Sequence, residues 1–436
     1  MAVGLVVLAL VTSGCWDFTG IDLLTACSPV GKIEAVAVLG PPCSTNVAAG
    51  TTQGTGVAVS GGGRFVAFIS NSSSLVPGDT NYEADVFVRD RELGGVQRVD
   101  VWSDGTQAAN GNTQQHNSTS VMFPAMSADG RYVTFFSMLP LASGANGHDS
   151  YVHDRQTGTT ELVNVGIDPS LTSLTGITAE MTPATISDDG RYVAFGTTGG
   201  YVFVRDRAAG TTKLVSLADD GTPASGVWPS ISGNGRYVVY YSDASNIVPN
   251  DTNNSGDTFV YDTVTGTTER VNVTSAGEQS AYSAWMLPAS ISDDGRYVAF
   301  ASSAWNLYGV GDPATWRGIH VFLRDRVGGT TEMIDSPGGH ASKSPSISDD
   351  GRYVAYTCAS CDTGSVVGVY VHDGAIGQTT RVGVTPDGQV PNGSEQLDYV
   401  KYMSGDGRYM TFESSSTNLV PNTLNGPWNT YVQRIS

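Results

Sequence analysis

The sequence is poor in positive charge. It has 23 Lys and Arg against 42 Asp and Glu, which gives a formal net charge of −19 at pH 7. Proteins that bind nucleic acid need a basic surface to neutralise the phosphates, so this balance argues against a nucleic-acid partner. An acidic surface suits a protein outside the cytoplasm that meets divalent cations, or it only keeps the protein soluble.

Two signatures of hydrolytic enzymes are also missing. The chain has no Gly-x-Ser-x-Gly nucleophile elbow and no His-Glu-x-x-His zinc motif. His153 and His372 occupy a position that Arg89 holds in an equivalent segment, so they follow a repeat and do not form a ligand set. Catalysis by carboxylates scattered over loops stays open as an alternative.

Long apolar runs are scarce. Residues 3–11 form an apolar run broken only by a glycine, and it is too short to span a bilayer as a lasting helix. We therefore expect residues 1–14 to be a secretory signal peptide. Thr12-Ser13-Gly14-Cys15 resembles the lipobox of bacterial lipoproteins, although Thr stands where Leu, Val or Ile is usual and no Lys or Arg precedes the run. The resemblance implies a lipid anchor on Cys15 with residues 15–31 as its linker; ordinary secretion is the alternative.

Cysteine is rare, and its number is odd. If Cys15 carries a lipid, four of the five Cys remain. In an oxidising compartment these four would pair, with Cys27–Cys43 stapling the N-terminal segment and Cys358–Cys361 closing a hairpin loop. Zinc is the rival interpretation of the Cys-Ala-Ser-Cys sequence, but no second Cys or His pair stands at metal-binding spacing.

Glycine, by contrast, is abundant, and part of it belongs to a repeat. The pair Gly-Arg, followed by Tyr or Phe and a short apolar run, recurs at intervals of 45 to 67 residues. A period of this size fits a four-stranded sheet with its loops, so the repeat predicts one ring of units where length alone suggests two or three domains. The arginines of the repeat are Arg64, Arg131, Arg191, Arg236, Arg296, Arg352 and Arg408.

Residues 288–335 illustrate one unit. A short apolar strand leads to Asp293-Asp294-Gly295, which has the chemistry of a hairpin turn, and residues 296–301 alternate as a second strand. After a variable segment, residues 320–325 and 330–334 supply a third and a fourth strand. Four short antiparallel strands, repeated radially so that neighbours cover both faces, make a β-propeller blade.

The pattern resembles the TolB-type, WD40-like propeller repeat. The resemblance rests on Ser-x-Asp-Gly-Arg-Tyr-Val-x-Phe, on third strands such as Val86-Phe87-Val88-Arg89-Asp90 and on the Gly-Thr-Thr that opens the last strand. It covers residues 54–436 and implies an all-β fold, a seven-bladed β-propeller of four-stranded antiparallel blades. It implies little about function, because this fold serves many. The TolB family looks six-bladed with an extra N-terminal α/β domain, so its envelope role is not transferred.

The two ends of the chain predict how the ring closes. The seventh unit has strands at residues 402–404, 408–412 and 430–432 and stops without a fourth strand. Residues 33–39 form an isolated strand before the first unit, and their pattern is similar to that of the fourth strand at residues 268–273. We therefore expect the N-terminal strand to complete the seventh blade, so that the propeller spans residues 32–436.

Alternating strand direction sorts the connections by face. The turns from strand one to two and from three to four are short and lie on one face, the tight-turn face. The connections from two to three and from four to the next blade are variable and lie on the other, the variable-loop face. Aromatic residues there suggest recognition of a glycan or a protein, unless they only pack the loops onto the blades. The candidate ligand-binding residues are Phe123, Trp228, Trp285, Trp305, Trp316 and Tyr399.

Two of the variable loops repeat a set of oxygen ligands. Both loops follow Val-Pro and precede a third strand. Three oxygen side chains in one loop suit a hard cation, so a Ca²⁺ site is one interpretation and a metal-free Asx turn is the other. The equivalent loop of the seventh unit, residues 422–425, has no carboxylates. The candidate ligands are Asp79, Asn81 and Asp85 in one loop and Asp251, Asn253 and Asp257 in the other.

Three functions are compatible with this organisation. The first is an extracytoplasmic binding or scaffold propeller, in the bacterial periplasm or at the cell surface, that recognises a glycan or protein through the variable-loop face. The second is a glycan hydrolase or lyase with its active site on that face, although the sequence shows no acid–base pair for it. The third is a structural envelope or surface component. Ca²⁺ is the one cofactor that the sequence suggests.

Overall fold

The computed structural model describes residues 32–36, 56–81, 83–108, 121–145, 147–171, 183–281, 287–308, 318–335, 340–359, 361, 366–397, 401–420 and 428–436. Among them, no helix has the length and apolar character needed to cross a membrane. The described helical pieces are two short 3-10 turns, η1 (Pro169–Leu171) and η2 (Trp305–Tyr308).

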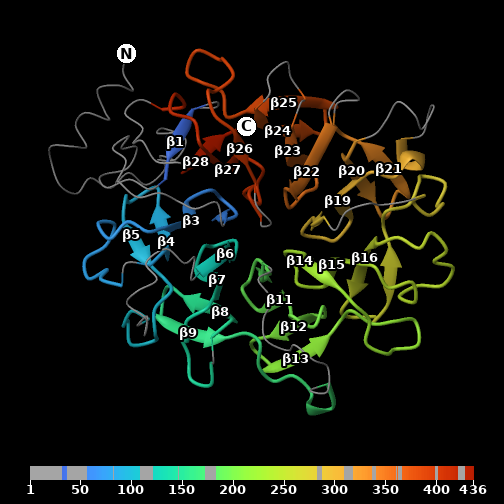
Figure 1. Ribbon diagram of the computed structural model, residues 1–436, viewed down its shortest axis with the longest axis horizontal. Coiled ribbons are helices and arrows are strands. Elements are labelled where there is room, and N and C mark those ends of the chain that lie inside the picture. Colours follow the sequence, from blue (N-terminus) through green and yellow to red (C-terminus); the bar gives the residue numbers. More distant parts are fainter. Residues whose placement is uncertain are drawn as a thin grey trace.

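The described strands form seven four-stranded antiparallel sheets arranged in a ring (Figure 1). The fold is therefore an all-β seven-bladed propeller, as the repeat predicts. In each blade the first strand lies towards the centre of the ring and the fourth lies at its rim.

The blades follow the order of the chain. Blade one contains β2 (Val57–Val59), β3 (Phe65–Ser70), β4 (Asp85–Asp90) and β5 (Val96–Arg98). Blade two contains β6 (Val121–Met126), β7 (Tyr132–Ser137), β8 (Asp149–Asp154) and β9 (Thr159–Leu162). Blade three contains β10 (Thr185–Ile186), β11 (Tyr192–Gly196), β12 (Val202–Asp206) and β13 (Thr211–Leu214). Blade four contains β14 (Val227–Ile231), β15 (Tyr237–Ser242), β16 (Asp257–Asp262) and β17 (Thr268–Arg270).

The remaining blades complete the ring. Blade five contains β18 (Ser290–Ile291), β19 (Tyr297–Ser302), β20 (His320–Asp325) and β21 (Thr330–Met333). Blade six contains β22 (His340–Ile347), β23 (Tyr353–Ala359), β24 (Val367–Asp373) and β25 (Gln378–Val382). Blade seven contains β26 (Glu395–Gln396), β27 (Tyr409–Ser414), β28 (Asn429–Arg434) and β1 (Ile33–Ala35).

Blade seven joins the two ends of the chain. Its sheet order is β1-β28-β27-β26, and Ile33 of β1 pairs with Gln433 of β28. The prediction that the N-terminal strand closes the ring is thereby confirmed; residues 37–39 of the predicted strand lie outside the described residues. The first strand of this blade differs from the predicted residues 402–404, because β26 lies earlier and Met403 contributes only a single bridge to Met410.

The core lies between the blades, because each sheet covers the faces of its neighbours. Strands two and three are almost wholly buried, as in β3 and β4 of blade one, whereas the fourth strand β5 is half-buried. Aromatic side chains of the second and third strands stack within blades, with 5.6 Å between the ring centroids of Phe195 and Phe203 and of Phe300 and Phe322. Each buried large apolar side chain contributes about 1.5–3 kcal/mol.

The repeated Ser-x-Asp-Gly segment builds the turn between the first and second strands. In blade five the Ser292 hydroxyl donates to Asp294 (2.8 Å) and accepts the amide N–H of Tyr297 (2.9 Å). Gly295 has a φ of 74° and lies against the ring of Tyr237 in blade four, where a Cβ atom would clash. Glycine is therefore required twice over, by the turn and by the contact with the preceding blade.

The repeated Arg ties the second strand to the third. Arg296 donates from Nε and Nη2 to the two oxygens of Asp325, at 3.0 and 2.7 Å, and its guanidinium lies 4.8 Å from the Tyr297 ring centroid. Blades one to six share this bidentate pair. In blade seven Arg408 instead contacts Asp406 of its own turn. The repeat is thus explained by the packing of the fold.

Backbone hydrogen bonds also join all seven blades at these turns. In each blade, a residue just after the turn Ser bonds its counterpart in the next blade, with N···O distances of 2.8–3.3 Å. The resulting ring surrounds the central channel on the tight-turn face. With the amide donor named first and the carbonyl acceptor second, the bonds are Gly61 to Ala128, Ala128 to Asp188, Asp188 to Gly233, Asn234 to Asp293, Asp293 to Asp349, Asp349 to Gly405, and Asp406 to Gly61.

Candidate functional site

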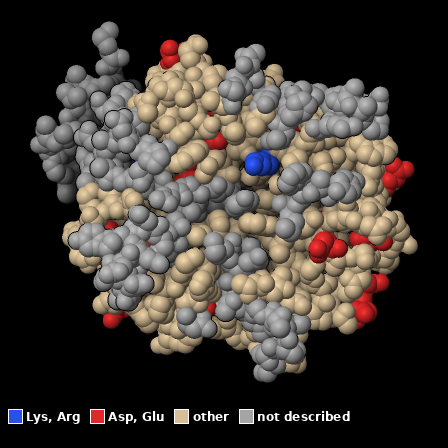
Figure 2. Space-filling view, in the orientation of Figure 1, with Lys and Arg blue, Asp and Glu red and all other residues tan. Residues whose placement is uncertain are grey.

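The two broad faces of the ring differ in charge. On the tight-turn face, the arginines of the repeat keep 34–48% of their side-chain surface exposed. Figure 2 shows one basic group near the centre of the face in view and acidic groups towards the rim. The face in view is therefore the variable-loop face, and most of its described surface is uncharged.

Three of the innermost strands carry the same irregularity. Phe123, Trp228 and Ser344 have φ angles of 54°, 57° and 55°, and each precedes a proline. The pairing register of β6, β14 and β22 shifts at these residues, which is the signature of a β-bulge. A left-handed backbone at a residue other than glycine costs about 1–3 kcal/mol, and such strain is concentrated at functional sites. The bulges occupy alternate blades, namely two, four and six.

Trp228 is the accessible aromatic residue among these bulges. It is half-buried and lines a cavity in the channel together with Pro229, Pro288, Pro345 and Lys401. Phe123, the other predicted ligand-binding residue on a bulge, is only 8% exposed and belongs to a core cluster. Among the described residues the channel wall thus presents the Trp228 indole beside prolines and a cation, a surface suited to an aromatic, apolar or sugar-ring contact.

The other predicted aromatic residues do not gather around Trp228 in the part of the chain that the structure describes. Trp305 lies in η2, between strands two and three of blade five, and is 51% exposed. Trp285, Trp316 and Tyr399 lie outside the described residues. Trp305 and Trp228 therefore lie at separate places on the variable-loop face, one at the outer loop and one at the channel.

The channel also holds an ion cluster that the sequence analysis missed. Lys401 occupies the position that Pro229 and Pro345 hold in blades four and six. Its Nζ lies 2.7 Å from Oδ1 of Asp349 in blade six and 3.6 Å from Oδ1 of Asp188 in blade three. Blades three and seven are not neighbours, so this lysine spans the channel. The departure from the repeat could have revealed it, since the aligned units show a cation where the other six have proline, alanine or valine.

Three carboxylates share this one ammonium group. Burial, together with the charge of Asp349, raises the pKa of Asp188 and of Asp293. Burial acts to lower the pKa of Lys401, but Asp349 and Asp188 outweigh it and the pKa is raised. Lys401 is therefore charged at neutral pH, and the cluster keeps an excess of negative charge.

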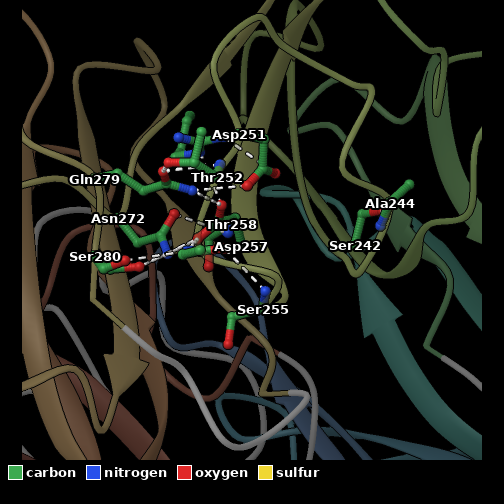
Figure 3. Close-up of polar contacts among 12 residues, drawn as sticks. Ser242, Ala244, Asp251, Thr252, Ser255, Asp257, Thr258, Asn272, Gln279 and Ser280 are labelled. Carbon is green, nitrogen blue, oxygen red and sulfur yellow. Dashed lines mark hydrogen bonds and ion pairs between the residues drawn. The ribbon is translucent and has the colours of Figure 1, made fainter.

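The loop before β16 brings the predicted ligands of blade four together (Figure 3). Asp251 and Asp257 lie against Arg270 of β17, with N···O distances of 3.1 and 2.8 Å. Gln279 donates to Asp251 (2.7 Å), and Asn253 donates to Asp257 (3.2 Å). Both carboxylate side chains are at most 2% exposed, so the guanidinium supplies the positive charge that burial of two carboxylates requires.

Blade one repeats this arrangement with one difference. Asp79 and Asp85 lie 3.5 and 3.7 Å from Arg98, and Asn81 donates to Asp85 (3.2 Å). Asp100, however, stands where blade four has Asn272. Burial and the neighbouring carboxylate raise the pKa of Asp100 well above its usual range, and burial raises that of Asp85 to about 6. These shifts favour a proton held between the two carboxyl groups, which hydrogen-bond to each other.

These contacts define what a cation would have to displace. Asn272 fills the Asp100 position in blade four with an amide that donates to Asp257 at 2.6 Å. Among the described residues no group of three or more His, Cys, Asp or Glu side chains is arranged to hold a metal. Ca²⁺ would compete with Arg98 or Arg270 for the same oxygens, and the Ca²⁺ hypothesis stays a prediction that chelation tests.

The cysteines and histidines occupy structural positions where they are described. A disulfide joins Cys358 of β23 to Cys361. Cys15, Cys27 and Cys43, together with the expected signal peptide, lie outside the described residues. His153 and His372 lie in third strands, and each shares a hydrogen bond with a threonine of the adjacent fourth strand, at 2.9 and 3.0 Å. Burial lowers the pKa of both histidines, to about 4 for His153.

The chain was compared with known proteins, and similarity was found to solved structures. No family model matches the chain, and no curated protein matches it. The chain is similar to a candidate TolB from Agrobacterium tumefaciens, with 16% identity and a TM-score of 0.43, over 73% of this chain and 92% of that one. It is also similar to TolB from Acinetobacter baumannii, with 11% identity and a TM-score of 0.39, over 80% and 75% of the two chains. The assignment of the fold rests on the strand topology described above.

Proposed function

We propose that the protein is an extracytoplasmic binding propeller that recognises a protein or glycan partner through the variable-loop face. Trp228 is the observation that carries this proposal. Its backbone is held in the left-handed region at the channel, where glycine or asparagine would be less strained. A half-buried indole kept at that position, with the exposed Trp305 on the same face, supports a recognition role.

The sequence and the cysteine pair support a compartment outside the cytoplasm. The Cys358–Cys361 disulfide suits an oxidising environment such as the periplasm or cell surface. As a fourth strand, β1 begins on the tight-turn face, so residues 15–31 would leave from that face. A lipid on Cys15 would then hold the tight turns towards the membrane and leave Trp228 and Trp305 pointing away from it.

Binding is tested with variants that separate recognition from folding. Trp228→Gly removes the indole and relieves the backbone strain, so we expect a stable protein with lost binding. Trp305→Ala removes the exposed ring without touching the channel. Val327→Ala is the matched control, because Val327 is 78% exposed in the turn between strands three and four, on the tight-turn face.

The readouts are a glycan array and photo-cross-linking from positions 305 and 327 in cell envelopes. We expect a glycan signal or a protein adduct from position 305 that is lost in Trp228→Gly and kept in Val327→Ala. A signal that survives both tryptophan substitutions, or the same partner cross-linked equally from position 327, would contradict recognition through the variable-loop face.

A further inference from the structure

Four blade interfaces are closed on the tight-turn face by an arginine that follows the third strand. In blade five, Arg326 binds the Glu269 carboxylate of blade four through Nε and the carbonyl oxygen of Gly295 through Nη1. Its guanidinium also lies 4.7 Å from the ring centroid of Tyr237 in blade four. A carboxylate, a carbonyl and a tyrosine ring thus form a socket for a guanidinium group. The arginines at this position are Arg91, Arg155, Arg207 and Arg326. Around Arg155, Gln97 and Phe65 take the places of the acid and the tyrosine.

The position of this arginine is fixed by a backbone hydrogen bond that recurs in every blade. The amide N–H of Arg326 donates to the carbonyl of Arg296 (2.9 Å), and that of Gly374 donates to the carbonyl of Arg352 (2.8 Å). Thr263 and Ile435 make the same bond in blades four and seven. Gly374, Thr263 and Ile435 therefore stand where the other blades have arginine.

The strand register identifies the residue that faces each of these positions across the interface. This facing residue lies on the fourth strand of the preceding blade. There it pairs with the third-strand residue that stands two positions before the last Asp of that strand, as Glu269 pairs with Val260. Where Thr263 replaces arginine, the facing residue is Lys213, and where Ile435 replaces it, the facing residue is Thr380. Both interfaces have lost the acid together with the arginine.

The interface between blades five and six departs from this rule. Gly374 has replaced the arginine, but the facing residue is still an acid, Glu332, opposite Leu323. Glu332 is exposed, and its carboxylate makes no hydrogen bond or ion pair with the described residues. The carbonyl oxygen of Gly351 likewise accepts no hydrogen bond from them. The acceptors of the socket are present while its own guanidinium is absent.

A groove of about 370 Å³ occupies the place of the missing side chain. It is lined by Tyr297, Glu332 and Gly351, the counterparts of the residues that hold Arg326, and by Gly374, the counterpart of Arg326 itself. Tyr237 in the filled socket lies between two guanidinium groups, Arg236 at 4.9 Å and Arg326 at 4.7 Å. Tyr297 has one such contact among the described residues, with Arg296 at 4.8 Å.

The charges around this groove favour a cation. Arg352 lines it but is engaged in a bidentate pair with Asp373, at 2.8 Å for both bonds. Burial lowers the pKa of His372, so its ring is neutral at neutral pH. Asp350 accepts hydrogen bonds from the Ser348 hydroxyl and the Arg352 amide, at 2.6 and 2.9 Å, so Glu332 remains as the groove carboxylate without an ion pair among the described residues.

We propose that the groove between blades five and six is a receptor site for an arginine side chain of a partner protein. The partner's guanidinium donates to Glu332 and to the Gly351 carbonyl and stacks on Tyr297, as Arg326 does one blade earlier. The site lies on the tight-turn face, so it does not depend on recognition through the variable-loop face.

The probe is N-acetyl-arginine amide, whose binding to the full-length protein is measured by ligand-observed NMR. N-acetyl-lysine amide and the uncharged N-acetyl-citrulline amide are the comparison ligands. Gly374→Arg fills the socket with the chain's own side chain; Gly374 has no positive φ, and an added Cβ would meet only the Arg352 carbonyl at 3.2 Å. Thr263→Arg adds the same charge at an interface without the acid, and Glu332→Gln removes the acid at an exposed position.

We expect millimolar binding of the arginine derivative that is weakened about tenfold or more by Gly374→Arg, several-fold by Glu332→Gln and not at all by Thr263→Arg. Gly374→Arg should also raise the melting temperature, whereas Thr263→Arg should not. The proposal is overturned if the arginine derivative binds Gly374→Arg as well as wild type, or if citrulline or lysine derivatives bind equally. A lower melting temperature for Gly374→Arg would count against it too, and Glu332→Gln then decides.

Discussion

Replacing Lys401 by Met removes the ammonium group of the channel cluster and leaves its half-buried carboxylates without that positive charge. Two unit charges about 4 Å apart interact by about 4 kcal/mol at an effective dielectric constant of 20. The contacts of Lys401 with Asp349 and Asp188, at 2.7 and 3.6 Å, are of that range. About a third of these side chains is exposed, which screens the attraction, and the lysine also loses hydration on burial. We therefore expect a net loss of about 2 kcal/mol at neutral pH.

The pH dependence of this loss identifies its cause. Burial and their mutual repulsion raise the folded-state pKa of Asp188 and Asp293 above the unfolded values, so ionisation of these groups opposes folding at neutral pH. That opposition is relieved as the pH falls through the folded-state pKa values. Removing Lys401 raises these values further, so the difference between wild type and Lys401→Met should be largest near pH 7–8 and shrink towards about pH 4.5.

The assay is urea denaturation of both proteins between pH 4.5 and 8. Lys401→Arg keeps the charge and should retain most of the stability, and Asp349→Asn in the Lys401→Met background should recover part of it. A stability difference that stays constant across this pH range would show that packing of the lysine stem, and not its charge, holds the channel. No difference at all would refute the reasoning from charge altogether.

Three further predictions concern other parts of the ring. Deleting residues 32–36 removes β1 and unpairs the edge of β28, so the melting temperature should fall by many degrees, and an unchanged melt would contradict the closure. Arg270→Ala leaves two buried carboxylates without a neutralising cation and should destabilise by about 3–5 kcal/mol in denaturation. A chelator that lowers the wild-type melting temperature would support Ca²⁺ in these loops, and an unchanged melt would reduce them to metal-free turns. Asp100→Asn reproduces the Asn272 arrangement of blade four and removes a carboxyl group whose folded-state pKa is raised. The free energy of unfolding at pH 8 should therefore rise by about 1–2 kcal/mol and vary less between pH 5 and 8. Identical pH profiles for the variant and wild type would contradict the shared proton.

The architecture could be predicted because each repeated residue has a local and an interblade task. Gly295 is needed for the turn and for contact with Tyr237, and Arg296 is needed for Asp325 of the third strand. Such tasks recur once in every blade, so they leave a periodic trace in the sequence. The N-terminal strand was predictable for the same reason, because it carries the pattern of a fourth strand.

The candidate sites were harder to predict because they depend on contacts between blades distant in the chain. Asp188 and Lys401 are separated by more than two hundred residues, and only the closed ring places them across one channel. The composition of the loops suggested oxygen ligands at Asp251 and Asp257, but the arginine that neutralises them comes from the following strand. Trp228 was selected for its residue type, while its strained backbone becomes visible only in the structure.

In a chain built from repeats, a residue that differs from the repeat has to be considered together with the residue that it contacts in the neighbouring blade. Ile435 and Thr380 depart together, and so do Thr263 and Lys213, which leaves those interfaces balanced. Gly374 departs alone, because Glu332 keeps the acid that the missing arginine would neutralise. A single departure of this kind leaves a binding group without its intramolecular partner, which is why we propose that Glu332 is open to an arginine of a second protein.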